Sequence, residues 1–168
     1  MTTTTKTGQL ETLRQGVLAG GAGGVAEVAW VALYAAATGG NAAVLARGVT
    51  TAAGVSALLP ASPVALGVAV HMTLAVALGV VLSFVWSALR TRRRGLNNPY
   101  PFMLAILGGV WAVNFFVVLP VVSPAFVHLV PYAVSLTSKL LFGMAAATAM
   151  RRWPAADLAP ILLGKRFD

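Results

Sequence analysis

The sequence has no cysteine and few acidic residues, and each shortage excludes a class of function. Without cysteine there is no disulfide, and no thiolate for an iron–sulfur cluster, covalently attached haem or a thiol metal site. Only four residues are acidic, which leaves no carboxylate pair suited to hydrolysis or to a di-iron site. A phosphate-binding loop, a metalloprotease helix and a nucleophile elbow are missing as well. We therefore expect that the chain is not an enzyme.

Charge of both signs is scarce, and hydrophobic residues fill the chain instead. Of 168 residues, 58% are hydrophobic and 10% are charged, whereas about a quarter of a soluble domain is charged. The mean hydropathy is +0.84. The net charge of +8 does not indicate nucleic-acid binding, because basic residues that flank membrane spans account for it. The composition predicts an integral membrane protein in contact with lipid.

Four apolar stretches are long enough to cross a bilayer, which takes about 20 residues. They cover approximately 15–38, 63–89, 100–119 and 126–150, with tails at 1–14 and 151–168. The sequence thus predicts an all-α membrane protein with four transmembrane helices in one integral membrane domain. A cleaved signal peptide fits the first stretch less well, because the stretch is long and contains Glu27.

The basic residues predict the topology. Ten of the twelve lie in the two tails and in the loop after the second span: Lys6, Arg14, Arg90, Arg92, Arg93, Arg94, Arg151, Arg152, Lys165 and Arg166. Lysine and arginine near span ends resist translocation. We therefore expect both termini on the cytoplasmic side.

The two outer loops are unusually apolar. Asn41 is placed to cap a short helix over 42–59 that Pro60 closes, and this helix is expected on the outer membrane surface, with a re-entrant segment as the alternative. The loop over 120–125 carries no charge and two prolines. We expect it to lie against lipid, the bundle or another subunit.

Small residues recur every four positions in the spans and predict close helix packing in a compact bundle. The glycines that define these rows are Gly16, Gly20, Gly24, Gly67, Gly79 and Gly143.

Three ionisable residues share those rows: Glu27, His71 and Lys139. The helical rise places them at similar depth in the outer half of the bilayer, with Asn114 nearer the surface. Ionisable groups inside a bilayer mark function by default. One interpretation is a static ion pair with His71 and Asn114 bonded around it. The others are a proton or ion pathway through Glu27 and His71, and a cofactor or quinone pocket lined by His71, Glu27 and Trp30.

No cofactor is identified by the sequence. His71 and His128 are candidate haem ligands by residue type, but His128 is expected near the outer rim and His71 well inside, so one iron does not reach both. The methionines do not cluster as a copper site requires, and no metal is expected.

Several runs carry a family resemblance: NFFVVLP at 114–120, SPAF at 123–126, SKLLFG at 138–143 and the Gly67–Gly79 pattern around His71. With these runs, the chain resembles small uncharacterised bacterial four-helix membrane proteins. The resemblance implies a bacterial inner-membrane location and no assigned activity.

The function expected from the sequence is that of a non-catalytic accessory subunit in a larger membrane complex, such as a respiratory or other redox assembly. The partner is then another integral membrane protein, or further copies of the chain. The alternatives are a small oligomeric transporter or proton-conducting protein that uses Glu27 and His71, and a haem- or quinone-binding membrane protein.

Overall fold

The computed structural model describes residues 3–58, 62–93 and 96–154, and for residues 3–7 and 42 it describes the backbone alone. Arg94, Pro60 and most of the predicted C-terminal tail lie outside the described residues. Within that part of the chain the regular structure is entirely helical. Four helices there are long and apolar enough to cross a membrane: Gly8–Thr38, Pro63–Arg92, Pro99–Val122 and Tyr132–Arg152. The predicted all-α, multi-pass membrane class is confirmed at this level.

The helices follow one another with short connections. In chain order they are α1 (Thr3–Thr38), α2 (Ala42–Ala52), α3 (Pro63–Arg92), α4 (Pro99–Val113), the π-helix η1 (Asn114–Val118), α5 (Leu119–Val122), α6 (Pro124–Val127) and α7 (Tyr132–Arg152). The first helix begins within the predicted tail. The last begins later than predicted, at Tyr132, because the 124–127 segment forms a separate helix before Pro131.

Local chemistry explains where several helices begin and end. The side chain of Asn41 accepts a hydrogen bond from the Ala43 N–H at 2.9 Å, and so caps α2 as predicted. The helix ends at Ala52 rather than continuing to Leu59, because Gly54 follows with a left-handed φ of 69°. Asn98 caps α4 in the same way as Asn41, through the Tyr100 N–H at 3.2 Å.

A π-helical turn joins α4 to α5 into one continuous rod. The Leu119 N–H bonds the Asn114 carbonyl, five residues back rather than four. Pro120 follows directly and has no N–H to offer the preceding turn, which favours a local change of helical register. The turn changes the face of the rod on which the residues after it lie.

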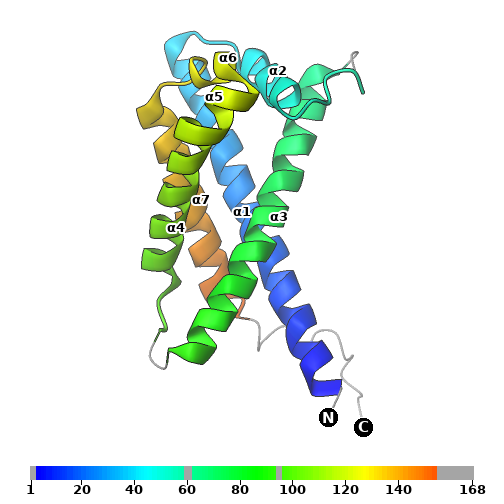
Figure 1. Ribbon diagram of the computed structural model, residues 1–168, viewed down its shortest axis with the longest axis vertical. Coiled ribbons are helices and arrows are strands. Elements are labelled where there is room, and N and C mark those ends of the chain that lie inside the picture. The colour runs from blue at the N-terminus through cyan, green and yellow to red at the C-terminus, as the bar shows by residue number, and fades with distance from the viewer. Residues whose placement is uncertain (1–2, 59–61, 94–95, 155–168) are drawn as a thin grey trace.

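The long helices form an open arc rather than a closed ring (Figure 1). The central helix α1 packs along both α3 and α7, and α4 packs on the far side of α7. At one end α3 reaches α4 through Trp86 and Phe102, whose ring centres lie 5.4 Å apart. Toward the other end α3 and the α4–α5 rod diverge, and α2 and α6 lie over the space between them (Figure 1).

Glycines bring α1 and α3 close together. A Cβ built on Gly20 would lie 2.5 Å from the Ala75 carbonyl oxygen, and one on Gly16 would lie 2.5 Å from the Val80 Cα. A Cβ on Gly79 would meet the backbone of Gly20 from the opposite side.

The remaining three predicted packing glycines also lie at contacts between elements. Gly24 faces Met72, Gly67 faces the α2 backbone at Ala46, and Gly143 faces α4 at Leu107. Each position therefore sets how closely its helix approaches a neighbour.

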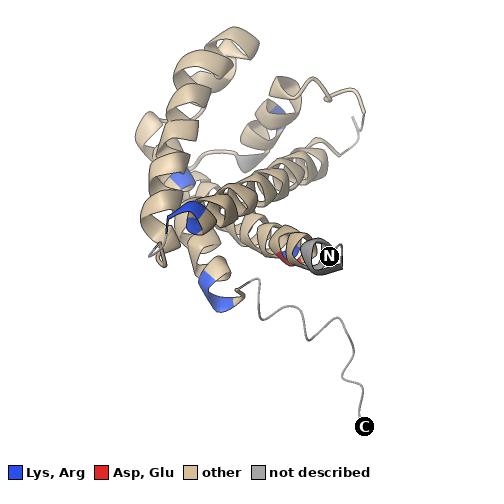
Figure 2. Cartoon of the chain, turned by 60° about the horizontal axis from the view of Figure 1, so that its bottom comes forward, with Lys and Arg blue, Asp and Glu red and all other residues tan. Residues whose placement is uncertain are grey.

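Basic residues gather at one end of the molecule (Figure 2). The last turn of α3 carries Arg90 and Arg92, and that of α7 carries Arg151 and Arg152. Near that end of α7, the Gln15 side-chain N–H of α1 donates to the Met150 carbonyl at 3.1 Å. These arginines lie at the end where the cytoplasmic face is predicted.

Candidate functional site

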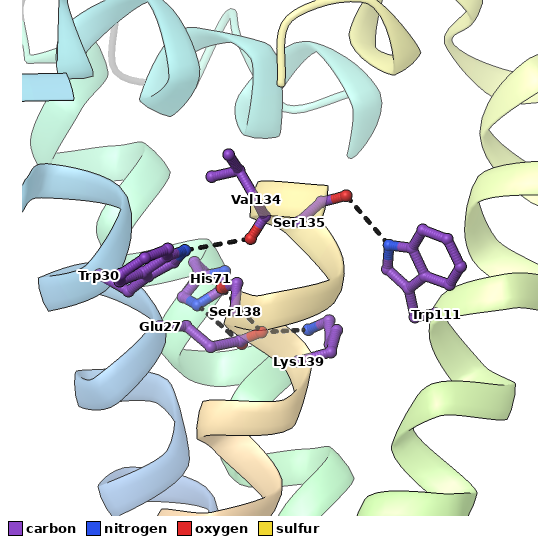
Figure 3. Close-up of polar contacts among 8 residues, drawn as sticks. All are labelled: Glu27, Trp30, His71, Trp111, Val134, Ser135, Ser138 and Lys139. Atoms are coloured by element: carbon purple, nitrogen blue, oxygen red, sulfur yellow. Dashed lines mark hydrogen bonds and ion pairs between the residues drawn. The ribbon is translucent and has the colours of Figure 1, made fainter. Parts of the chain in front are cut away.

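Three helices place ionisable side chains around one buried carboxylate (Figure 3). Glu27 of α1 is 3% exposed. Its Oε1 lies 2.7 Å from Lys139 Nζ of α7, and its Oε2 lies 3.3 Å from His71 Nε2 of α3. The Ser138 hydroxyl donates to Oε1 at 3.4 Å. We call Glu27, His71 and Lys139 the polar centre.

The Glu27–Lys139 pair is the stronger of the two ionic contacts. A separation of 2.7 Å is that of a charge-assisted hydrogen bond. The ammonium also lies 5.7 Å from the centre of the Phe142 ring on its own helix, where the ring face attracts a cation. Since the carboxylate and the ammonium carry opposite unit charges, the pair contributes no net charge to the interior.

His71 is held less firmly. Its Nε2 lies within ion-pair reach of Glu27, but the contact does not have the geometry of a hydrogen bond, and this buried nitrogen has no hydrogen-bond partner among the described residues. Its side chain is 27% exposed. Imidazole exchanges protons near neutral pH more readily than any other side chain. The ring thus has hydrogen-bonding capacity that the protein itself leaves unused.

The polar centre lies on the wall of a large cavity of about 610 Å³. The walls come from α1, α3, α7 and the η1–α5 segment, and residues of α2 and α6 contribute to the lining where these helices cover the space. Apart from the polar centre, Asn114 and two serines, every lining side chain is apolar or glycine. Ligand sites are commonly of this size and character, with a few polar groups in a mainly apolar lining.

Asn114 reaches the same cavity from η1 but makes no hydrogen bond to the polar centre within the described part of the chain. The structure therefore places it on the cavity wall, outside the bonded contacts of the polar centre.

Trp30 lies outside the cavity, whereas the sequence suggested it as a pocket residue beside His71 and Glu27. Its indole N–H donates to the Val134 carbonyl at 3.0 Å and ties α1 to α7 (Figure 3). It does not line the cavity. Trp111 makes a similar link from α4, donating to the Ser135 hydroxyl at 3.0 Å.

His128 follows α6 directly and is absent from the cavity wall. It is not brought to the polar centre, so the two histidines do not form one site. Within residues 3–58, 62–93 and 96–154, no three of His, Cys, Asp and Glu gather as a metal site would require.

Two features of the site escaped sequence reasoning. Ser138 contacts the carboxylate, and its only signal was its position next to Lys139. A pocket beside Glu27 and His71 was one interpretation of the sequence, but its size and its other walls had no sequence signal, because they depend on how far α3 diverges from the α4–α5 rod and on where α2 lies.

No family model, curated protein or solved structure matches this chain. The chemistry of the site is therefore the basis for the functional assignment.

Proposed function

We propose that this protein binds an apolar, bilayer-dissolved ligand in its cavity, and does so as a non-catalytic subunit of a larger complex in the bacterial inner membrane. The cavity of about 610 Å³ carries the proposal. An apolar lining of that size favours a hydrocarbon body, and a single polar cluster on its wall favours one polar head.

The position of the cavity favours access from the lipid phase. Its lining includes Leu74 on α3 and Val118 on η1, which are 59% and 42% exposed. These two residues belong to the helices that diverge from each other (Figure 1). A ligand dissolved in the bilayer would reach the space between them without crossing water.

The described chain outside its four spans supports the role of a subunit. It consists of short helices and turns, and apolar side chains are prominent among them. Leu58, in the connection between α2 and α3, is 73% exposed. An exposed apolar turn is stabilised by lipid or by an apolar partner surface. A respiratory or other redox assembly, with its many integral membrane subunits, is the kind of complex we propose.

The binding claim is tested by native mass spectrometry of the full chain released from its own membranes. We expect an apolar adduct on the wild type. The Val118→Trp variant places a bulky ring in the cavity and should lose the adduct, whereas the matched Val117→Trp variant, one position along η1 and off the cavity wall, should keep it. A wild type without an adduct, or an adduct that survives Val118→Trp, would refute the proposal.

The subunit claim needs a separate experiment. Purification from native membranes in a mild detergent should yield the chain with other integral membrane proteins. A visible absorption spectrum of the same preparation reports whether redox cofactors accompany it. Recovery of the chain as a stable monomer without partners would remove this part of the proposal.

A second candidate is proton or ion movement through the polar centre. The observation in its favour is that Glu27 and His71 both line the cavity while the His71 Nε2 has no hydrogen-bond partner among the described residues. Proton flux into liposomes containing the protein should then fall in Glu27→Gln and His71→Ala. Flux unchanged by both substitutions would rule this candidate out.

A further inference from the structure

The charge balance of the polar centre restricts the head of the ligand. The Glu27 carboxylate and the Lys139 ammonium neutralise each other at 2.7 Å. An anionic head is attracted by the ammonium but repelled by the carboxylate, and for a cationic head the two effects are reversed, so the pair compensates neither charge. Neither ion recovers its lost hydration in an apolar cavity, where uncompensated charge is costly. The site therefore favours an uncharged head.

The unused hydrogen-bonding groups are mostly donors. The ammonium of Lys139 has three N–H groups, and Glu27 accepts one of them. Glu27 Oε1 already accepts from both Lys139 and Ser138, while Oε2 faces His71. The amide of Asn114 adds two N–H donors to the lining, and the neutral imidazole of His71 adds one N–H donor and one acceptor. A head that complements this lining supplies acceptors, and among the uncharged oxygens of lipid-soluble molecules a carbonyl oxygen is a strong acceptor that carries no hydrogen of its own.

These donors come from three separate elements, and two of them, His71 and Lys139, lie beside the same Glu27 carboxylate. His71 lies on α3, Lys139 on α7 and Asn114 on η1, and all three line the same cavity. A flat ring with carbonyl oxygens on opposite edges presents acceptors to two walls at once. An ester or a hydroxyl group presents its polar atoms to only one wall of the cavity. The remaining lining is apolar and accommodates a hydrocarbon tail.

We infer that the ligand is a neutral quinone-type molecule, a ring with two opposed carbonyl groups on a hydrocarbon tail, held by N–H donors of His71, Lys139 and Asn114. This inference rests on the proposed function, since it names the ligand class of the same cavity. It concerns binding alone and assigns no electron transfer to the chain.

The test uses the full chain in phosphatidylcholine nanodiscs and radiolabelled decylbenzoquinone, with retention by empty nanodiscs subtracted. Decanoate, decylamine and decylbenzene share the tail and serve as competitors with an anionic, a cationic and an apolar head. We expect saturable retention of the quinone. Each competitor should need a concentration at least about tenfold higher than unlabelled quinone to displace it, since each lacks hydrogen bonds of the neutral carbonyl head.

Two variants test the donors while leaving the Glu27–Lys139 pair intact. His71→Leu and Asn114→Leu should each weaken quinone retention by about threefold to tenfold, the loss expected for one hydrogen bond. Binding of radiolabelled decylbenzene, which has no carbonyl, should not change in either variant. Equal losses for both probes would show that the substitutions damage the cavity and would overturn the assignment of the donors.

The failure of this inference is distinguishable from failure of the proposed function. If a competitor displaces the quinone as well as unlabelled quinone does, the neutral carbonyl head is wrong while the cavity still binds ligand. If no quinone is retained but the native adduct is present and sensitive to Val118→Trp, only the quinone class fails. If there is neither retention nor adduct, both fail.

Discussion

Glu27 of α1 and Lys139 of α7 form an ion pair of 2.7 Å whose carboxylate side chain is 4% exposed. The pair joins two helices and also lies on the cavity wall. It therefore combines two of the three interpretations that the sequence left open, the static ion pair and the ligand pocket, because a structural ion pair also provides the polar wall of the proposed ligand site.

Removing one partner of this pair should destabilise the protein. Lys139→Ala leaves the Glu27 carboxylate buried without its cation, which typically costs about 3–5 kcal/mol. For a chain of this size that corresponds to a melting temperature lower by about 6–20 °C. Thermal unfolding in detergent micelles measures the shift. A variant as stable as the wild type would show that the pair makes no such contribution.

Removing both charges should restore part of that loss. The double variant Glu27→Gln with Lys139→Met leaves no uncompensated charge in the interior. A double-mutant cycle with the single variants Glu27→Gln and Lys139→Met should give a coupling energy of about 0.5–3 kcal/mol. Strictly additive effects of the two changes would mean that the residues are not energetic partners.

The contact between α1 and α3 should tolerate a side chain at one glycine and not at its neighbour. A Cβ on Gly20 would lie 2.5 Å from a backbone oxygen of α3, whereas a Cβ on Gly21 meets nothing within 4 Å. Gly20→Leu should therefore lower stability by at least about 1–3 kcal/mol. Gly21→Leu should change it by less than about 1 kcal/mol, since leucine also favours the helix. Equal melting temperatures would contradict this packing.

The native sequence, which has no cysteine, allows the predicted topology to be tested with single introduced thiols. Thr91→Cys lies in the last turn of α3 among the arginines, and Thr51→Cys lies in α2 toward the other end. Both positions are exposed. In intact cells, a membrane-impermeant maleimide should label Thr51→Cys and leave Thr91→Cys unlabelled until the membrane is opened. The reverse pattern would overturn the cytoplasmic placement of both termini.

Trp30 should act in helix packing and not in ligand binding. Its indole N–H bonds the Val134 carbonyl at 3.0 Å, and the ring is off the cavity wall. Trp30→Phe keeps a ring and removes the donor, which should cost about 0.5–1.5 kcal/mol of stability. Retention of decylbenzoquinone should be unchanged. A loss of retention comparable with that of His71→Leu would place Trp30 in the binding site after all.

Much of the architecture follows from the sequence because the bilayer restricts what a chain can form. Hydrophobic length alone indicates four helices. The ionisable residues Glu27, His71 and Lys139 fall on rows of small residues and at similar depth in the bilayer. The sequence therefore predicts that they lie close together. The atoms that pair within it depend on rotamers. These follow from neighbours such as Ser138 and Phe142, which periodicity does not resolve.

The cavity and its cover required the structure. Where α2 lies depends on the approach of Ala46 to Gly67, a contact between two segments with no shared pattern in the sequence. The end of α2 depends on the left-handed conformation of Gly54, whereas the sequence predicts that Pro60 closes this helix. The π turn at 114–118 shifts the helical register of the residues that follow it, and a regular helical wheel does not represent that shift.

Photochemical cross-linking tests most directly whether the cavity binds a hydrocarbon chain. A short alkyl probe bearing a diazirine, added to the full chain in a bilayer, is cross-linked by light and mapped by peptide mass spectrometry. We expect labelling of cavity residues on α3 and η1, such as Leu74 and Val118, and loss of this labelling in Val118→Trp but not in Val117→Trp. Labelling confined to outward-facing positions such as Val81 and Val113, and unaffected by either variant, would contradict binding in the cavity.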